Sequence, residues 1–416
     1  MSVRPDPLSR EPRRAAARRL GSLLRSIGSA ISFASPRDAR KVIAGSWLGR
    51  RFADNPKYFL RHLARQRPEL DLVWIGDPSI RDGVANEPGI RFVPIGGARA
   101  RWEMLTAGTV LLTHGLADLG ESSCLGGARR VYLGHGLAIK RMGHVDGTRR
   151  SVLQRLMRYI VGAHARCTDF IASSEAHREK ILAEFGSIGS REARIHLYGQ
   201  PRVDYLMAGA GDAEEGRARE LILRKLGLPD GSRIVLYLPT FRDSGAEVRS
   251  FIRAEPAESA AIEHQLARLG AVLLEKSHFV DLEREREGGT GGNSRVRSLA
   301  GANWIDTQEL LLAADVLVTD YSGCFVDYLL LDRPIIHYAY DRREYETADR
   351  GLYFNLDDVA GGDIVATHAE LLASMSEALV HGPSHGADRR REVRARLVSC
   401  EGGDSCIRLE STLFPR

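Results

Sequence analysis

Short apolar runs rich in β-branched residues alternate along the chain with longer segments in which apolar residues recur every three or four positions. The short runs predict buried strands, and the longer segments predict amphipathic helices. The expected strands are Lys41–Ala44, Asp71–Ile75, Ile90–Ile95, Thr109–Thr113, Arg130–Leu133, Asp169–Ala172, Arg194–Tyr198, Arg233–Leu238, Ala271–Glu275, Asn303–Ile305, Asp315–Thr319 and Pro334–Tyr338. This alternation predicts an α/β fold with parallel sheets and helices on both faces.

The helical period is clearest in "NPKYFLRHLARQ", "SVLQRLMRYIVGA" and "EAHREKILAEF". A stretch rich in small and charged residues separates two groups of strands, which predicts two doubly wound, Rossmann-like domains with a cleft between them. The stretch "REGGTGGNSR" has the composition of a surface loop. The predicted parts are an arm (1–37), a first domain (38–207), a linker (208–232), a second domain (233–380) and a C-terminal helical segment (381–416).

The composition of the 416 residues, 43% of them hydrophobic, is that of a globular protein with a large core. The net charge of +5 comes from the first 30 residues, which contain seven arginines, Asp6 and Glu11. The remaining chain is neutral overall, which argues against a nucleic-acid-binding surface. It indicates one basic arm instead.

Within this arm, apolar residues lie at helical spacing opposite the arginines: Leu20, Leu23, Leu24, Ile27 and Ile31. Such a helix can lie on the inner surface of an anionic membrane. Two alternatives stay open, namely that the apolar stripe packs on the protein's own core or that the segment is a disordered tail. No apolar region follows the basic residues as in a secretory signal, and no stretch reaches the roughly 20 apolar residues of a membrane-spanning helix.

The five cysteines are scattered and contain no Cys-x-x-Cys pair. This pattern predicts neither a disulfide framework nor a zinc site, and it favours a reducing cytoplasm.

Polar residues follow several of the predicted strands, at the sheet edge where α/β proteins bind ligands. "DYSG" (320–323) follows the strand Asp315–Thr319, and Arg242, Lys276 and His278 follow two neighbouring strands. Exposed amides where a helix begins can bind a phosphate, and a glycine lets the phosphate approach the backbone. Ser322 is also an ordinary N-cap, which is the structural alternative.

His135 lies between Gly134 and Gly136 at another strand end. A histidine in such a loop can act as a general base, because its ordinary pKa lies near neutrality. A structural role is the alternative, and His114 in "LLTHG" competes for the catalytic role.

In this order, "FADNPKYFLRHL", "GHGLAIKRMG", "SSEAHREKILAEFG", "YGQPRVDYL", "YLPTFRD", "VLVTDYSGCFVDYLLLDRPIIHYAYDRREYE" and "RGLYFN" resemble the CDP-glycerol glycerophosphotransferase family. That family includes the teichoic-acid primases and polymerases and related capsule polymerases. The resemblance covers roughly residues 38–412.

This resemblance implies a glycosyltransferase-B-like fold, with the acceptor at the first domain and the nucleotide donor at the second. It implies transfer of a polyol phosphate, most simply glycerol phosphate, from a CDP-linked donor to a hydroxyl of a lipid-linked or polymer acceptor. His135 and His278 correspond to the family's functional histidines. The remaining site residues would be a donor-binding set, Asp320, Tyr321, Ser322, Gly323, Arg242, Thr240 and Lys276, and a supporting set, Gly136, Lys140, Ser174, Glu175, Arg202 and Asp327.

The chain departs from the family's pattern at three places. Leu137 and Ala138 stand where the family usually has Thr-Pro, Gly323 replaces a serine, and Phe279 replaces a proline. The departures leave the reaction type unchanged, but the identity of the polyol and of the acceptor stays open.

The hypothesis is that His135 takes a proton from the acceptor hydroxyl, which attacks the distal phosphorus, and that CMP leaves with its charge met by the turn after Asp320, by Arg242 and by His278. No Asp-x-Asp at a plausible strand end and no cluster with metal-ligand spacing is present, so we expect no metal ion and no other cofactor. Two alternatives remain: a nucleotide-sugar glycosyltransferase of the same fold, and an inactive membrane-associated binding homologue.

Overall fold

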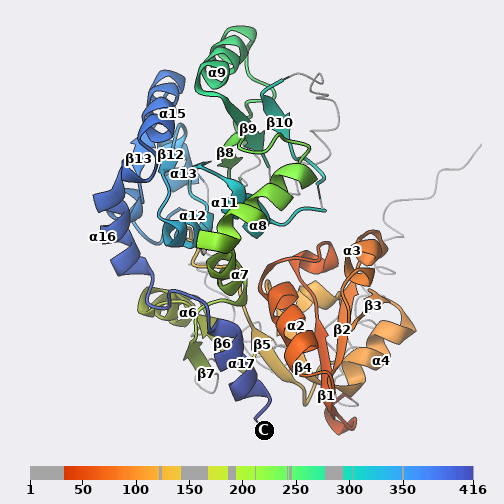
Figure 1. The fold of residues 1–416 in the computed structure, drawn as a ribbon. Helices are drawn as coiled ribbons and strands as arrows, with labels where there is room; N and C mark the ends of the chain where they lie inside the picture. Colours follow the sequence, from red (N-terminus) through yellow and green to blue (C-terminus); the bar gives the residue numbers. More distant parts are fainter. Residues whose placement is uncertain are drawn as a thin grey trace, which may run out of the picture. The chain divides into compact units, whose positions relative to one another are not determined.

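The computed structural model describes residues 32–120, 124–141, 167–185, 194–210, 212–240, 242, 246–276, 294–302, 304–348 and 351–415. Most of the predicted arm, the helix expected at 151–163 and His278 lie outside the described residues. Contacts divide the chain into two compact units (Figure 1). Of the described residues, the first unit contains those up to Gly134 together with 167–170 and Arg194, and the second contains 135–141, 171–185 and the chain from Ile195 onward. The units interleave in the sequence, and the predicted domain bounds, which follow chain order, stay a prediction.

Within the described residues, the larger sheet has seven strands in the order β3-β2-β1-β4-β5-β6-β7, and its pairings from β3 to β6 are parallel. The strands are β1 (Asp38–Ala44), β2 (Asp71–Gly76), β3 (Ile90–Pro94), β4 (Ala107–Leu112), β5 (Arg129–Tyr132), β6 (Asp169–Ala172) and β7 (Arg194–Leu197). Among its described residues, the first unit has the α-helices α2 (Asp54–Gln66), α3 (Arg81–Ala85) and α4 (Ala98–Thr106). The amphipathic segment predicted around "NPKYFLRHLARQ" is α2, and it buries Phe59, Leu60 and Leu63.

The second sheet has six parallel strands in the part of the chain that the structure describes, in the order β10-β9-β8-β11-β12-β13. They are β8 (Arg233–Leu238), β9 (Ala271–Glu275), β10 (Val296–Ser298), β11 (Val316–Thr319), β12 (Ile335–Tyr338) and β13 (Asp363–Val365). The α-helices in the described part of the second unit are α6 (Glu175–Phe185), α7 (Pro201–Gly209), α8 (Asp212–Lys225), α9 (Pro256–Leu269), α11 (Thr307–Ala313), α12 (Cys324–Tyr328), α13 (Arg342–Ala348), α14 (Leu356–Val359), α15 (His368–His381), α16 (Ala387–Leu397) and α17 (Ser405–Leu413).

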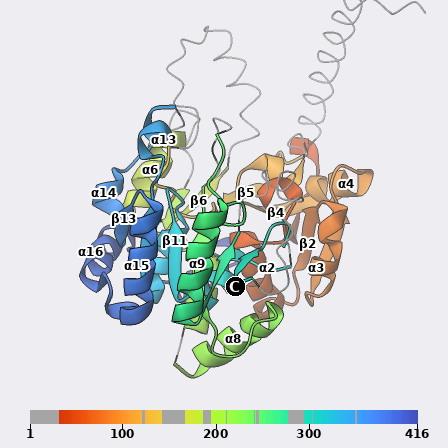
Figure 2. The same cartoon turned by 90° about the horizontal axis from the view of Figure 1, so that it is seen from above.

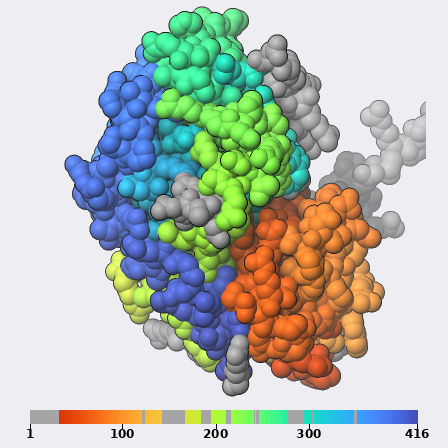
Figure 3. Space-filling model, in the orientation of Figure 1, coloured from red at the N-terminus to blue at the C-terminus, as the bar shows by residue number. Residues whose placement is uncertain are grey.

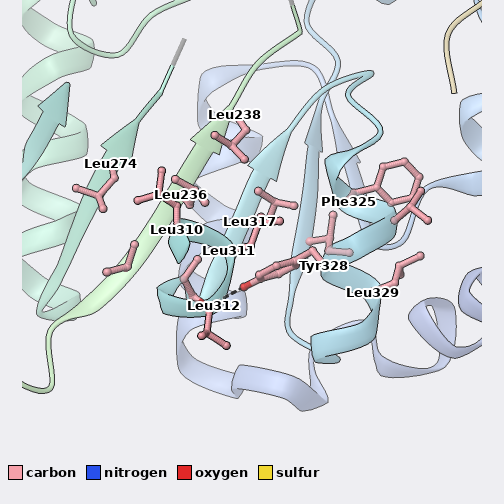
Figure 4. Packing of buried hydrophobic residues seen from close by; sticks show 14 of the residues in the cluster. Leu236, Leu238, Leu274, Leu310, Leu311, Leu312, Leu317, Phe325, Tyr328 and Leu329 are labelled. Carbon is pink, nitrogen blue, oxygen red and sulfur yellow. Dashed lines mark hydrogen bonds between the residues drawn. The ribbon is translucent and has the colours of Figure 1, made fainter. Parts of the chain in front are cut away.

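Alternation along β8 explains why helices cover both faces of this sheet. Ile234, Leu236 and Leu238 point into one apolar cluster, whereas Val235 and Tyr237 point into another. Figure 4 shows the first cluster, in which side chains from β8, β9 and β11 pack against α11 and α12. Burial of one such leucine stabilises the fold by about 2 kcal/mol.

The second cluster lies beneath α9 and α15, which are side by side in Figures 1 and 2. The N-terminus of α15 carries a capping box formed by Thr367 and Glu370, which satisfies amides that the helix leaves unpaired. The chain then continues through α16 and α17, which run over the surface of the second unit (Figure 3).

One expected strand is wrong. Trp304 and Ile305, the described residues of the expected strand Asn303–Ile305, form a turn, and the edge strand β10 comes earlier, at Val296–Ser298. The physical reason is the capping box of Asp306 and Glu309, which begins α11 immediately after Ile305. The edge strand β13 was not expected, since it is only three residues long. Within the described parts of the chain, no helix is long and apolar enough to cross a membrane.

Strand order creates a topological switch point between β8 and β11, because the chain moves outward from β8 to β9 and β10 on one side and from β11 to β12 and β13 on the other. Leu238 and Thr319 are register partners at the carboxyl ends of these two strands. Ligands in open α/β sheets bind at this position.

Candidate functional site

Asp320 joins the two loops that leave the switch point. Its carboxylate accepts hydrogen bonds from the Thr240 amide (2.9 Å), the Thr240 hydroxyl (2.6 Å) and the Tyr321 amide (2.6 Å). The Asp320 and Thr240 side chains are both buried. A carboxylate with these partners fixes the loops to each other, so its geometric role is to position the turn at 320–323.

Arg242 is buried beside this carboxylate. Its Nη2 lies 2.9 Å from Asp320 Oδ2, its Nε lies 2.7 Å from Asp341 Oδ2, and its side chain is only 1% exposed. Burial alone would lower the pKa of the guanidinium, but the two carboxylates raise it well above its ordinary value. The predicted donor-binding cation is therefore already paired within the protein.

Aromatic rings surround the Arg242 guanidinium. Tyr321 and Tyr345 stack with 4.0 Å between ring centroids, and the guanidinium carbon lies 5.2 Å and 4.9 Å from those two rings. The Tyr321 hydroxyl donates to Asp341 Oδ1 at 3.0 Å. Burial and then the Asp341 charge raise the pKa of Tyr321, so this phenol stays protonated. Tyr321 thus supports the turn from its buried side.

His337, at the end of β12, fixes the backbone of the same turn. Its Nε2 accepts from the Gly361 amide at 3.2 Å, so Nδ1 carries the proton and donates to the Asp320 carbonyl at 3.1 Å. The imidazole is fully buried, and burial lowers its pKa to about 4. It is therefore a neutral structural group at pH 7.

The exposed part of the turn consists of Ser322 and Gly323, which are both partly accessible. The helix α12 that follows has only five residues, and Gly323 is its N-cap. Burial raises the pKa of the next side chain, Cys324, to about 11, so it is a thiol rather than a thiolate. Ser322 and Gly323 are the residues of this turn that keep accessible surface.

Residues 135–141, called the His135 loop below, belong to the second unit, as does the turn at 320–323. Gly134 and Gly136 have φ of +63° and +106°, a backbone conformation that side chains disfavour. Leu137 and Ile139 then enter the core cluster of this unit, with exposed fractions of 1% and 0%. The glycines turn the chain, and the two apolar side chains anchor it in the core. His135, which lies between the two glycines, is partly exposed.

This loop touches the turn directly. A Cβ atom added to Gly323 would overlap the Leu137 carbonyl oxygen and lie 3.0 Å from the Ala138 Cα. The two departures from the family's pattern, Leu137–Ala138 and Gly323, are therefore in contact with each other.

Arg202 forms a second link between the same segments. Its guanidinium occupies the space where a Cβ of Gly136 would stand, and its Nη2 pairs with Asp327 Oδ2 in α12 at 2.8 Å. Asp327 also accepts from Gln308 Nε2 at 3.0 Å. Both charged side chains are almost fully buried. The predicted supporting residues Gly136, Arg202 and Asp327 thus lie together.

Other predicted residues lie in different surroundings. Lys276 is buried and donates to the Ile305 carbonyl at 2.7 Å, and Lys140 forms an isolated antiparallel bridge with Leu352. The Ser174 hydroxyl accepts from the His177 amide in the first turn of α6, and Glu175 forms an exposed pair with Arg178 at 3.1 Å. These two residues serve the start of α6.

His114 belongs to the first unit, where Nδ1 lies 2.9 Å from the Thr113 hydroxyl and the ring is 4.6 Å from that of Trp47. Of the two histidines that competed for the catalytic role, His135 is the one in the same unit as the turn at 320–323.

Sequence reasoning missed His337 and Asp341. His337 lies within β12, the strand paired with β11, and Asp341 lies just beyond its end. For Asp341 the available signal was the polar sequence after the predicted strand Pro334–Tyr338, whereas His337 lies inside that apolar run and gave no such signal.

Among the described residues, no group of three or more His, Cys, Asp or Glu side chains is arranged to hold a metal ion. The expectation of a metal-independent reaction stays a prediction.

The family model of CDP-glycerol:poly(glycerophosphate) glycerophosphotransferases matches residues 28–415. The chain belongs to this family. The predicted family, the enzyme class and the predicted function of glycerophosphate transfer are confirmed. A teichoic acid poly(glycerol phosphate) polymerase of Bacillus spizizenii is 23% identical over 82% of this chain and 84% of its own length. A teichoic acid glycerol-phosphate transferase of Staphylococcus aureus is 23% identical over 89% and 91%.

Among solved structures, the wall teichoic acid polymerase TagF is similar, with a TM-score of 0.75 and 19% identity over 96% of each chain. With the two sheets described above, this similarity confirms the predicted α/β class of two Rossmann-like domains related to glycosyltransferase-B folds.

Proposed function

We propose that this member of the family transfers glycerol phosphate from CDP-glycerol to a hydroxyl of a growing polymer or a lipid-linked acceptor in the synthesis of a teichoic-acid-like or capsular polymer. The observation that carries the proposal is the packing of the His135 loop on the turn at 320–323 within one compact unit. The family match over residues 28–415 supports the donor class.

In the proposed reaction, the donor diphosphate lies against the accessible side of Ser322 and Gly323, where the backbone can be approached closely. The His135 imidazole takes the proton of the acceptor hydroxyl. The acceptor oxygen bonds to the distal phosphorus as the bond from that phosphorus to the bridging oxygen breaks, and CMP leaves with the electron pair. His278, outside the described residues, is proposed to meet the charge on CMP.

The buried groups act through position rather than by touching the donor. Asp320, Arg242 and Thr240 hold the turn in one conformation, and the bonds from the Tyr321 hydroxyl to Asp341 and from His337 to the Asp320 carbonyl fix its first two residues. In phosphoryl transfer, positioning and charge stabilisation supply most of the rate enhancement. We therefore assign Arg242 and Asp320 to the support of the donor site.

The basic arm is proposed to hold the enzyme at the inner membrane surface. Its arginines and apolar stripe suit an anionic bilayer. Confinement to the surface raises the local concentration of a lipid-linked acceptor.

The test is to incubate the full-length chain with CDP-glycerol or CDP-ribitol and an acceptor, and to measure CMP release and product mass. We expect CMP from the wild type, loss by at least about 100-fold in His135→Ala, and full activity in His381→Ala, a matched change at an exposed histidine. Release of UDP or GDP from nucleotide sugars would identify a glycosyltransferase instead. No nucleotide release from any donor would favour the inactive binding homologue.

A further inference from the structure

Two glycines lie at the contacts of the His135 loop with the turn at 320–323 and with Arg202, and a Cβ added at either would overlap a neighbouring atom. At Gly323, an added Cβ would overlap the Leu137 carbonyl oxygen. At Gly136, it would overlap the Arg202 guanidinium, which is paired in turn with Asp327 in the helix that begins at the turn. The same two segments are thus linked at two separate points.

Gly323 is not needed for backbone conformation. Its φ is −69°, which any residue adopts, so the space beside it is the reason that a side chain is excluded. The neighbouring atom is a backbone carbonyl oxygen of Leu137, whose side chain is anchored in the core. This oxygen cannot rotate away as the end of a flexible side chain would. A methyl group at position 323 must therefore push the backbone of the His135 loop and the backbone of the turn apart.

We propose that Gly323 and Arg202 are positioning residues that lock the His135 loop and the turn at 320–323 into one rigid body, so that the distance from imidazole to donor phosphate is set before the substrates bind. The proposal rests on the proposed function. In this proposal His135 and the donor-binding turn belong to the same rigid body, because the contacts that join them lie wholly within the second unit.

The two links differ in chemistry. The contact at Gly323 is steric and uncharged, whereas the Arg202–Asp327 link is a buried ion pair with 7% and 6% of its side chains exposed. Asp327→Asn leaves the Arg202 charge buried with a weaker partner. Gly323→Ala tests the first link without altering any charge.

The decisive experiment is Gly323→Ala in the full-length chain, with two matched controls. Gly83→Ala meets no atom within 4 Å, and Gly108→Ala meets the Asp38 carbonyl oxygen at 2.6 Å in the first unit, which contains neither His135 nor the turn. Gly108→Ala therefore reproduces a backbone clash and its loss of stability without touching either link.

We expect Gly323→Ala to lower kcat for CMP release about 100-fold, because a displacement of about 1 Å costs about that factor. The proposed donor also lies against Gly323, so only kcat and hydrogen exchange serve as readouts of the lock in this variant. Asp327→Asn should also lower kcat relative to wild type. Gly108→Ala should keep kcat within about threefold of wild type at a temperature where it is folded. Amide hydrogen exchange should rise in residues 135–141 in Gly323→Ala and stay at the wild-type level in Gly108→Ala.

The proposed lock is overturned if Gly323→Ala keeps the wild-type kcat. It is also overturned if Gly323→Ala and Gly108→Ala lose kcat equally. Unchanged exchange in residues 135–141 overturns it as well. Absence of CMP release from the wild type overturns the proposed function instead, so the two failures are distinguishable.

Discussion

Asp320→Asn tests whether the most buried carboxylate of the site touches the donor or supports the turn. The substitution keeps the size of the side chain but removes its charge. One amide oxygen must then replace two carboxylate oxygens that accept from Thr240 and Tyr321, and Arg242 loses one of its two carboxylate partners. The NH₂ group of the new amide would also face hydrogen-bond donors, from which it cannot accept.

The magnitude follows from burial. Asp320 and Arg242 are 0% and 1% exposed, so water cannot replace the lost partner. Removing one partner of a buried ion pair costs about 3–5 kcal/mol, and we expect this loss in the free energy of unfolding. Asp341→Asn should cost about half as much, roughly 2 kcal/mol, because the Asp341 side chain is 19% exposed and water can compensate in part.

Urea denaturation measures this loss, with Asp388→Asn as the control because the Asp388 side chain is 95% exposed. Steady-state kinetics on the folded fraction supply the second readout: a supporting role predicts a lower kcat, whereas direct donor contact predicts mainly a higher KM. A stability within about 1 kcal/mol of wild type, together with a raised KM alone, would refute the supporting role of Asp320.

Two further predictions concern pH and the arm. Burial lowers the pKa of His177 to about 3 and of His337 to about 4, from 6.5 in the unfolded chain, so their contribution to stability is complete above pH 6.5 and is lost as the pH falls from 6.5 towards 4. The loss at pH 5 is about 2 kcal/mol for each histidine, and His337→Asn should reduce the loss of stability between pH 6.5 and pH 5 in urea denaturation by about that amount; an unaltered pH dependence would exclude this cause. Deletion of residues 1–31 should reduce binding to vesicles of anionic lipid and activity on lipid-linked acceptors, while activity on soluble acceptor analogues stays the same. Equal loss on both acceptors would contradict a membrane role of the arm.

Much of the fold could be predicted from local pattern, because a parallel strand buried on both faces must be a short, continuous apolar run. The strands at 169–172, 233–238 and 271–275 were predicted with the observed bounds. Where a run was short and weakly apolar, as in β10 and β13, the pattern carried too little signal and one strand was misplaced.

The residues of the site could be listed from the sequence because polar groups that follow strands gather at one sheet edge. Family resemblance added Arg202 and Asp327 without showing why they matter. Only the tertiary structure brings Arg202 beneath Gly136, since the two are 66 positions apart and meet through the packing of α7 against the loop.

The sequence by itself determined the fold class, the family and the polar residues at the strand ends, since these depend on local periodicity and on contiguous motifs. The tertiary structure alone decided which of those residues are buried and paired and which keep accessible surface. Arg242 is buried between two carboxylates, whereas Ser322 and Gly323 keep accessible surface. Burial and pairing depend on side chains brought together from distant strands, and no single segment encodes them.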